Sequence, residues 1–516
     1  MAARRPPRAV FMAFGTQGDV YPLVAIAAAL AKDQCQYQVV IITHAAHEDL
    51  VVHLATQNVS LIPICTPPVI SGIKDHVKSG MVESSSREKF IGKEHRRKCL
   101  SAMQKVFGDG STVEGDFVVI NFFALEGWHL AEFFRVRCVV AAPYVVPYSA
   151  PSSFANRFKR ELPLLYEFLQ EAPTGKVCWK DVLHWMWPLF TEEWGYWRSE
   201  ILSLSPCPFT DPVTGLPMWH DREQSPLLLY GFSKEVVECP AYWPPNVHVC
   251  GFWFLPVEWQ FECYKCRVLS TAYHSGQMDK KDGLCVAHGN LQHFLETSSS
   301  DSCAPIFIGL SSSGSMGFLQ NPQAFLRVIR EVLENTNYRF LLFTASYEPL
   351  TDAIQAFNTE QFGFQQSKKS SCGDGILLFD NRLFCFSGII QYRWLFPRCQ
   401  IVVHHGGSGS TAAALYAGTP QIICPFMLDQ FYWAEKMSWL GVAPSPLKQS
   451  ELIPDCDDDV SIKKAAMSLS NAIKEALSSE VRARASELAA KISSEDGVEE
   501  ALKVLKQQII FQSQHE

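Results

Sequence analysis

Hydrophobic residues in this chain gather in short continuous runs, and longer stretches of helical periodicity separate one run from the next. Runs that are apolar throughout are typical of parallel β-strands, because helices cover both faces of a parallel sheet. In the first half of the chain the runs lie at residues 9–14, 37–43, 59–63, 116–124, 138–148, 226–232 and 247–252. In the second half they lie at residues 305–310, 338–344, 375–380, 383–386, 401–404 and from Gln421 onward. This alternation predicts an α/β protein built on doubly wound sheets.

The length of the chain indicates that these predicted strands and helices form two domains. A chain of 516 residues is too long for one compact core. We assign residues 1–255 to an N-terminal domain, 256–304 to a linker with a cysteine-rich insertion, 305–460 to a C-terminal domain and 461–516 to charged amphipathic helices. Within the first domain, residues 71–110 are polar and weakly periodic, which predicts a mobile excursion rather than core.

Composition narrows the classes of partner and the compartment. A net charge of -8 without a basic stripe argues against nucleic acid as a partner. The 17 cysteines are scattered, which favours reduced thiols in the cytoplasm over a disulfide framework. The apolar run after the basic start is too short for a signal peptide, and no apolar stretch has the length of a membrane span. We therefore expect a cytoplasmic protein that contacts a membrane at most peripherally.

The most informative stretch follows the apolar run at residues 401–404. Three glycines within four residues let the backbone approach a ligand closely. Behind them we expect a helix that Ser410 or Thr411 opens and that Gly418 ends. The free N–H groups and dipole of such a helix suit a phosphate, although an ordinary strand-to-helix turn is the plain alternative. The candidate phosphate ligands are His405, Gly407, Ser408, Gly409, Ser410 and Thr411.

A second pair of candidates lies one strand further along the chain. Asp429 and Gln430 close the run that starts at Gln421. In an open α/β sheet, ligands bind at the carboxyl ends of the strands, so both residues should face the same crevice as His405. A carboxylate next to an amide offers acceptors and donors for neighbouring sugar hydroxyls.

These motifs resemble the donor-binding block of UDP-dependent glycosyltransferases, most closely that of the sterol 3-beta-glucosyltransferases and the bacterial glycopeptide glycosyltransferases. The block consists here of Trp394-Leu-Phe-Pro-Arg-Cys, His404-His405-Gly-Gly-Ser-Gly-Ser-Thr, Gly418-Thr-Pro420 and Pro425 to Gln430. The resemblance implies the GT-B fold, with two Rossmann-like domains facing a cleft, and transfer of sugar with inversion. It implies no catalytic metal and no cofactor, with the UDP-sugar as co-substrate.

The same resemblance adds further residues to the expected donor site. It implies that Trp394 and Ser315, in the serine-rich loop after the run at 305–310, contact the nucleotide. Gln391-Tyr392-Arg393 stands where the family has Pro-His-Asp, which concerns the nucleobase contacts. Family members also pass a C-terminal helix back across the first domain, and we expect this of residues 461–516.

Asp19 is the candidate catalytic residue. It closes the loop Gly15-Thr-Gln-Gly-Asp19 after the first apolar run, where a carboxylate either caps a helix or takes a proton. The loop is similar to the family's Gly-Thr-Arg-Gly-Asp, which implies that Asp19 is the base and that Gly18 lies near the donor. Gln17 replaces the family's arginine.

Aromatic residues concentrate between residues 162 and 219, in segments with helical character. They form either the core of the first domain, a wall for a flat apolar acceptor such as a sterol, or a membrane contact. His129, on an early helix turn, is more often structural than a ligand.

The linker contains Cys263, Cys266, Cys285 and His288, a spacing that fits tetrahedral zinc. The segment is polar, however, and from the sequence we favour a linker without metal.

Together these features predict an inverting glycosyltransferase that moves a sugar, with glucose favoured, from a UDP-sugar to a lipophilic alcohol such as a sterol, a step of lipid metabolism. One alternative is a catalytically inactive relative that binds sterol or lipid as a carrier or regulator. Another is a nucleotide-binding epimerase of similar fold.

Overall fold

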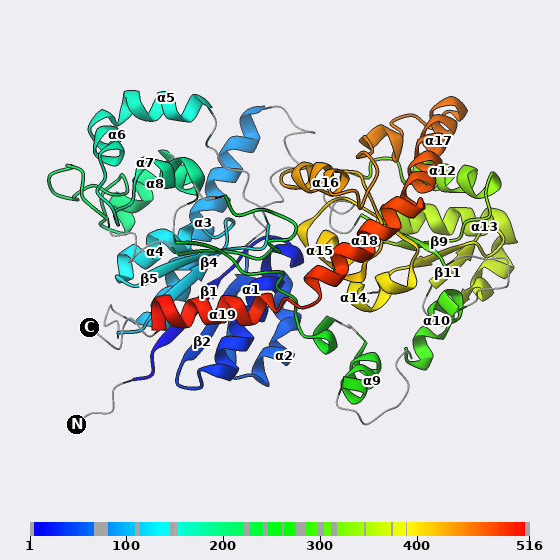
Figure 1. The fold of residues 1–516 in the computed structure, drawn as a ribbon, viewed down its shortest axis with the longest axis horizontal. Helices are drawn as coiled ribbons and strands as arrows, with labels where there is room; N and C mark the ends of the chain where they lie inside the picture. The colour runs from blue at the N-terminus through cyan, green and yellow to red at the C-terminus, as the bar shows by residue number, and fades with distance from the viewer. Residues whose placement is uncertain are drawn as a thin grey trace. The chain divides into compact units, whose positions relative to one another are not determined.

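The computed structural model describes most of the chain and divides it into two compact units. Unit 1 comprises Met1–Phe254 and Glu495–Glu516, and unit 2 comprises Leu255–Ser494. Figure 1 shows the course of the chain through both. The described residues are 5–66, 81–108, 114–144, 150, 152–190, 192–220, 227–240, 243, 246–260, 263–274, 284–296, 304–310, 317–344, 347–372, 375–388 and 390–510.

Unit 1 is built on a seven-stranded sheet in the order β3-β2-β1-β4-β5-β6-β7, in which every pair is parallel. Its strands are almost entirely buried, which explains their continuous apolar sequences. They are β1 (Arg8–Met12), β2 (Gln38–His44), β3 (Val59–Ile64), β4 (Phe117–Ile120), β5 (Arg137–Ala142), β6 (Leu227–Tyr230) and β7 (Val247–Val249).

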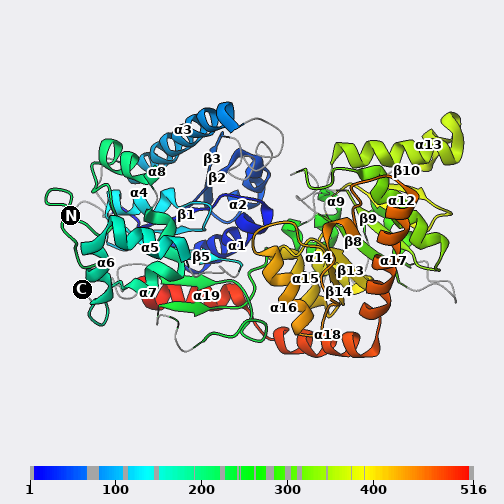
Figure 2. The same ribbon diagram turned by 90° about the horizontal axis from the view of Figure 1, so that it is seen from above.

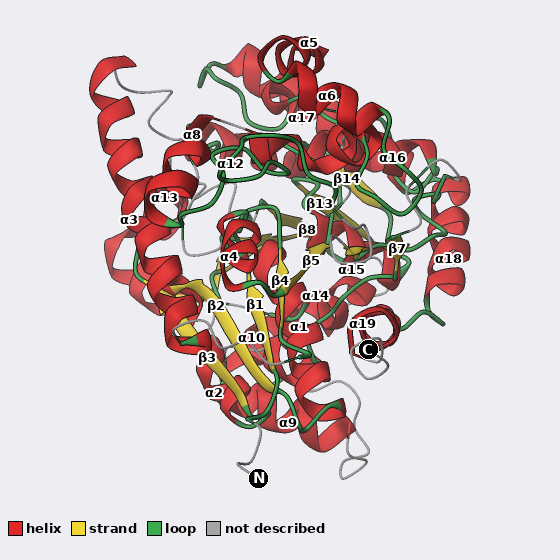
Figure 3. Cartoon of the chain, turned by 90° about the vertical axis from the view of Figure 1, so that its left-hand side faces the viewer, coloured by secondary structure: helices red, strands yellow, loops and turns green. Residues whose placement is uncertain are grey.

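Helices cover both sides of this sheet. Figures 2 and 3 show α3 (Met81–Phe107) on one side and α19 (Gly497–Leu505), packed on α1 (Gln17–Asp33), on the other. The remaining helices of unit 1 are η1 (Ala45–Leu50), α2 (Val51–Ala55), α4 (Glu126–Phe134), α5 (Ser152–Glu161), α6 (Pro163–Gln170), α7 (Trp179–Asp181), η3 (Val182–Met186), η4 (Trp187–Phe190), α8 (Glu192–Tyr196), η5 (Trp197–Ile201) and η10 (Lys506–Ile510).

Unit 2 has a second seven-stranded sheet, in the order β10-β11-β12-β9-β8-β13-β14. It is parallel except at one edge, where β10, β11 and β12 pair antiparallel. The strands are β8 (Ile306–Gly309), β9 (Phe340–Phe343), β10 (Ser371–Cys372), β11 (Gly375–Leu378), β12 (Leu383–Phe386), β13 (Ile401–His404) and β14 (Gln421–Ile423). The helices are η6 (Val257–Gln260), α9 (Tyr264–His274), η7 (Val286–His288), α10 (Gly289–Glu296), α12 (Pro322–Glu334), α13 (Glu348–Ser370), α14 (Tyr392–Leu395), η8 (Phe396–Arg398), α15 (Ser408–Ala417), α16 (Gln430–Trp439), η9 (Gln449–Glu451), α17 (Asp459–Ala476) and α18 (Ser479–Ile492).

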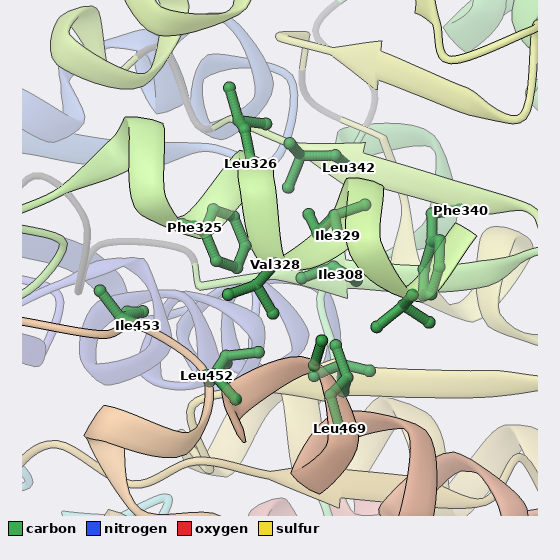
Figure 4. Packing of buried hydrophobic residues seen from close by; sticks show 14 of the residues in the cluster. Ile308, Phe325, Leu326, Val328, Ile329, Phe340, Leu342, Leu452, Ile453 and Leu469 are labelled. Carbon is green, nitrogen blue, oxygen red and sulfur yellow. The ribbon is translucent and has the colours of Figure 1, made fainter. Parts of the chain in front are cut away.

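Alternate residues of each central strand in unit 2 belong to two different cores. On β8, Ile306 and Ile308 pack with α12, α13 and α17, whereas Phe307 packs with α10, α14 and α15. This division follows from the two-residue repeat of a strand. Figure 4 shows the first of these cores, in which Val328 and Ile329 of α12 lie close to Ile308. The predicted doubly wound architecture is therefore confirmed in both units.

Three boundaries differ from those predicted. Residues 81–107 form the helix α3 rather than an irregular excursion, because Cys99, Met103 and Phe107 give its C-terminal half a buried face. The linker belongs to unit 2, which begins at Leu255.

The C-terminal tail differs as well, because among its described helices α17 and α18 belong to unit 2 and only α19 and η10 belong to unit 1. The side chains of Asp458, Ser478 and Asp496 cap α17, α18 and α19, so each side chain starts a new helix. Within unit 2, α17 packs on α12 and α18 packs on α15. In unit 1, α19 is held by backbone contact between Gly251 and Gly497 and by the bond from the Ser233 hydroxyl to Glu495 at 2.7 Å.

Among the described residues, none of the helices is both long enough and apolar enough to span a bilayer.

Candidate functional site

The turn between β13 and α15 places a helix N-terminus at the carboxyl end of the central strands of unit 2. Gly406 has a positive φ of 88°, and a side chain there would come within 3.0 Å of the carbonyl oxygen of Gln430. Gly407 is the N-cap, so α15 begins at Ser408, two residues before the predicted Ser410. The predicted end of the helix is confirmed, since Gly418 is a left-handed C-cap.

The first turn of α15 offers unpaired polar groups to a ligand. The first helical bond runs from the N–H of Thr411 to the carbonyl oxygen of Gly407 at 3.0 Å, so the N–H groups of Ser408, Gly409 and Ser410 precede it, and Gly407 has no side chain to cap them. The hydroxyl of Thr411 is fully buried and has no hydrogen-bond partner among the described residues. A methyl group added to Gly409 would meet no described atom within 4 Å, so the surface of this turn is open. Ser408 is half-buried and Ser410 is buried.

The two histidines beside this turn have different surroundings. His404 is completely buried: its Nδ1 accepts the N–H of Gly406 at 3.1 Å, so its Nε2 donates to Gln421 at 2.9 Å. His405 lies over Gly407, because a Cβ on Gly407 would be 2.4 Å from its Nε2. Burial lowers the pKa of His405 to about 3, with a further lowering by His404, so its ring is neutral. The Nδ1 atom of His405 has no partner among the described residues.

Asp429 and Gln430 lie at the start of α16, next to the same turn. Gln430 accepts the N–H groups of Phe426 and Met427 through its Oε1, at 2.9 and 3.1 Å. Its amide oxygen is therefore occupied, and its NH₂ group is what remains for a ligand. The Asp429 carboxylate accepts the indole N–H of Trp433 at 3.1 Å through one oxygen. The backbone of Gln430 lies against Gly406, the residue that follows His405, and the side chain of Gln430 is available to a ligand as a donor only.

Trp394 of α14 lies against α15 within unit 2, and one face of its ring is occupied. The guanidinium of Arg398 sits 4.1 Å from the ring centroid. Tyr392, where the family has histidine, packs into the core, stacked on Phe396 at 4.6 Å. The predicted contact Ser315 lies outside the described residues.

Asp19 of unit 1 lies in the first turn of α1, after the turn that leaves β1. Its Oδ2 accepts the N–H and the hydroxyl of Thr16, at 2.7 and 2.8 Å, so Asp19 does cap the helix start. Gly15, with φ of 112°, leaves the space that this carboxylate fills, because a Cβ there would be 2.6 Å from Oδ2. Oδ1 accepts no hydrogen bond from the described residues, and Gly18 precedes Asp19 in the first turn of α1.

The environment of Asp19 makes its carboxyl group harder to ionise than that of an exposed aspartate. Burial raises the pKa of its carboxyl to about 6, although the hydrogen bonds from Thr16 act in the opposite direction. No cation contributes to this shift, and Gln17, which replaces the family's arginine, is exposed. The carboxylate is therefore more basic than an ordinary aspartate and is ionised at neutral pH.

Two residues that the sequence did not point to hold this loop. Asn121, after β4, donates to the carbonyl oxygens of Phe14 and Asp19 at 2.8 and 3.2 Å and accepts the N–H of Phe14. His47, after β2, bonds the carbonyl oxygen of Gly15 at 3.1 Å. Both follow the carboxyl ends of strands that neighbour β1, and that position was the available signal.

The aromatic segment of unit 1 is mainly core. Trp185, Trp194 and Trp197 are at most 8% exposed. His129 is fully buried beneath them and accepts from Arg198 at 2.9 Å, so it is structural. Tyr196, 65% exposed, is an exception.

The four residues of the linker motif are brought together. The sulfurs of Cys263, Cys266 and Cys285 and a ring nitrogen of His288 all lie within 4.8 Å of one another.

Comparisons with known proteins agree with this architecture. The C-terminal domain family of erythromycin biosynthesis protein CIII-like proteins matches residues 386–503. A sterol 3-beta-glucosyltransferase of Arabidopsis thaliana is 26% identical over 507 residues, covering 96% of this chain and 65% of the relative. A sterol 3-beta-glucosyltransferase of Komagataella phaffii is 23% identical over 516 residues, covering 99% of this chain and 35% of the relative. This chain thus spans less than two thirds of the length of these relatives.

Solved structures agree on the fold. The kitacinnamycin glycotransferase matches with a TM-score of 0.56 and 13% identity, covering 98% of this chain and 100% of that one. The calicheamicin glycosyltransferase matches with a TM-score of 0.56 and 14% identity, covering 98% of each chain. Over nearly its whole length, the chain therefore resembles the sterol 3-beta-glucosyltransferases of the UDP-glycosyltransferase superfamily, and it has the two-domain GT-B fold of the solved glycosyltransferases.

Proposed function

We propose that this protein is an inverting glycosyltransferase that transfers glucose from a UDP-sugar to the hydroxyl of a sterol. The observation that carries the proposal is the start of α15, where helix N–H groups, the Thr411 hydroxyl and the His405 ring gather without partners among the described residues. The names of the relatives support glucose as the sugar and a sterol as the acceptor.

In this proposal the N-terminus of α15 binds the diphosphate. A helix N-terminus carries roughly half a positive charge, and its N–H groups donate to phosphate oxygens. His405 adds a neutral N–H donor next to Gly407, and its low pKa keeps it neutral through the working range. In this proposal the NH₂ group of Gln430 donates to the sugar hydroxyls, and the carboxylate of Asp429, which also accepts the indole N–H of Trp433, accepts from them. Trp394 offers its remaining face to the nucleobase.

Transfer requires a base for the acceptor and a site for the departing charge. The acceptor oxygen forms a bond to the anomeric carbon while the bond from that carbon to the diphosphate oxygen breaks. The electron pair of the broken bond stays on UDP, where the α15 end stabilises it. The acceptor proton passes to Asp19, whose Oδ1 accepts no hydrogen bond from the described residues and whose pKa, raised to about 6 by burial, suits a base at neutral pH.

The test is a transfer assay with purified protein, several UDP-sugars and a panel of sterols. We expect UDP release that depends on both substrates, strongest with UDP-glucose and a 3-hydroxysterol. The product should carry a β-linked sugar by NMR, because the α-linked donor is inverted. Tight sterol binding without transfer for any pair would instead support an inactive lipid-binding protein. Peripheral contact with a membrane and a cytoplasmic location belong to the same proposal, and co-sedimentation with sterol-containing vesicles tests the contact.

A further inference from the structure

The linker motif of unit 2 forms a compact cluster that the glycosyl transfer chemistry does not use. Cys263 directly precedes α9, and Cys266 lies in its first turn. Cys285 directly precedes η7, and His288 is its last residue. Each pair is separated by two residues, so each turn presents two side chains to the same point. Figure 1 shows the two short helices, α9 and α10, at whose starts these turns lie.

The distances within the cluster match a tetrahedron around a metal ion. The sulfurs of Cys263 and Cys285 are 3.6 Å apart, and Nδ1 of His288 lies 3.3 Å from the sulfur of Cys266 and 3.4 Å from that of Cys285. Around tetrahedral zinc, with bonds of about 2.3 Å to sulfur and 2.0–2.1 Å to nitrogen, two sulfurs are separated by about 3.8 Å and a sulfur and a nitrogen by about 3.6 Å. The observed separations differ from these by a few tenths of an ångström.

The surroundings also favour a metal over thiols that merely fill space. Cys266 and Cys285 are 3% and 5% exposed, and both belong to the core beneath α10 and α14. The backbone N–H of Cys285 points at the sulfur of Cys266, at 3.4 Å, a bond that fixes the orientation of a ligating thiolate. The ring of His288 is held edge-on against Phe386. Among the described residues, this is the one group of three or more cysteine, histidine or acidic side chains with ligand atoms so close together.

We propose that Cys263, Cys266, Cys285 and His288 bind one structural Zn²⁺ ion. Three thiolates and an imidazole are a ligand set typical of zinc, and four protein ligands leave no open position for substrate or water.

The position of the site explains what the ion would stabilise. Leu291 and Phe294 anchor α10 on the sheet of unit 2, near β12. Among the described residues of α9, Cys266 and the partly buried Leu269 are those that reach this core. The ion would therefore join α9 to the start of α10 and fix the fold of the linker. This role is independent of the proposed transfer activity.

Zinc content is the direct test. The full chain is produced in medium supplemented with zinc and purified under reducing conditions without chelator, and metals are measured by mass spectrometry. We expect about one zinc per chain, falling to a small fraction in Cys263→Ser and Cys285→Ser. The matched control is Cys456→Ser, at an exposed cysteine of the same unit, which should keep the zinc. His288→Cys should also keep it, because a fourth thiolate can replace the imidazole.

A second measurement, on wild-type protein, tests the proposal even if the serine variants fold poorly. Wild-type protein refilled with Co²⁺ should show the intense visible absorption of tetrahedral cobalt bound to thiolates. Loss of zinc to a strong chelator should lower the melting temperature of wild type and leave that of Cys263→Ser unchanged. The proposal is overturned if zinc-supplied, reduced wild type holds no zinc. It is also overturned if Cys263→Ser and Cys285→Ser retain the zinc, or if peptide mapping of reduced-purified protein finds Cys263 joined to Cys285 in a disulfide.

Discussion

The substitution Asp19→Asn separates two roles of one side chain, the capping of α1 and the acceptance of a proton. Oδ2 accepts two hydrogen bonds from Thr16, at 2.7 and 2.8 Å, and an amide oxygen in the same place accepts both. The start of the helix should therefore survive the change. The amide is uncharged, so it avoids the burial cost that raises the pKa of the carboxyl from 3.8 to about 6.

The sign of that cost follows from linkage. The pKa of Asp19 is higher in the folded protein than in the unfolded chain, so its stabilising contribution is complete below about pH 4 and is lost as the pH rises through about 6. Above that pH the ionised side chain destabilises the fold by at most about 3 kcal/mol, at about 1.36 kcal/mol per pKa unit. Asp19 is only partly buried, so contact with solvent lowers this figure. At pH 7.5, Asp19→Asn should be as stable as wild type or more stable.

The transfer activity of Asp19→Asn should fall, although its stability does not. Removal of a general base lowers kcat by roughly 10²–10⁴-fold, which corresponds to about 3–5 kcal/mol in the barrier. For wild type, kcat/KM should rise about tenfold per pH unit below the pKa of about 6 and level off above it. The variant should lose this dependence. Its affinity for UDP should match that of wild type, because the proposed diphosphate contacts come from the first turn of α15 and from His405 and not from Asp19.

The assays are steady-state transfer between pH 5 and pH 8, denaturant unfolding at pH 7.5 and calorimetry with UDP. A variant that is less stable at pH 7.5 yet keeps most of its transfer activity would show that Asp19 is only a helix cap. A wild-type profile without a group titrating near pH 6 would refute the assignment of Asp19 as the base.

Other predictions concern the donor site. His405→Ala should weaken UDP binding by about 1–3 kcal/mol, measured by calorimetry, and equal affinity would remove His405 from the site. Gly407→Ala places a methyl group 2.4 Å from Nε2 of His405, so UDP affinity should fall while circular dichroism stays native. Gly409→Ala meets no described protein atom within 4 Å, so its melting temperature should be unchanged or higher, and only a ligand at the first turn of α15 would make UDP binding weaker. Omission of Mg²⁺ and Mn²⁺ should leave kcat/KM unchanged, and a strict requirement for either ion would contradict the proposed role of α15.

Much of the fold could be predicted because buried parallel strands have continuous apolar sequences. β13, β14 and the glycine turn were placed from local sequence, and Gly418 ended α15 as expected. The start of α15 was misplaced because serine and threonine are usual N-caps, whereas here Gly407 holds that position beneath the ring of His405. That arrangement depends on the contact between the His405 ring and the backbone of Gly407, and residue propensities do not include such a contact.

The linker cluster shows why the spacing of its cysteines and histidine alone does not predict that the four side chains come together. From the sequence, a polar composition argued against order in this segment, and a linker without metal was favoured. In the structure, Leu291 and Phe294 pack α10 on the sheet, and the fold-back brings His288 to Cys266. The described part of this segment is therefore ordered by tertiary packing of a few apolar side chains, whose partners in β12 lie almost a hundred residues further along the chain. Asn121 and His47 were missed for the same reason, since they meet the Asp19 loop only through strand order.

The return of α19 to unit 1 has a consequence for the order in which the protein can fold as it is synthesised. Unit 2 is one continuous stretch, so all of its residues have been made before α19 leaves the ribosome. Unit 1 begins first but cannot be complete until Gly497 reaches Gly251 and the apolar face of α19 covers α1. Domains usually fold in the order of their synthesis. The nascent first unit therefore keeps α1 uncovered until α19 has been made, so a truncation that removes α19 would damage the unit whose synthesis began before that of unit 2.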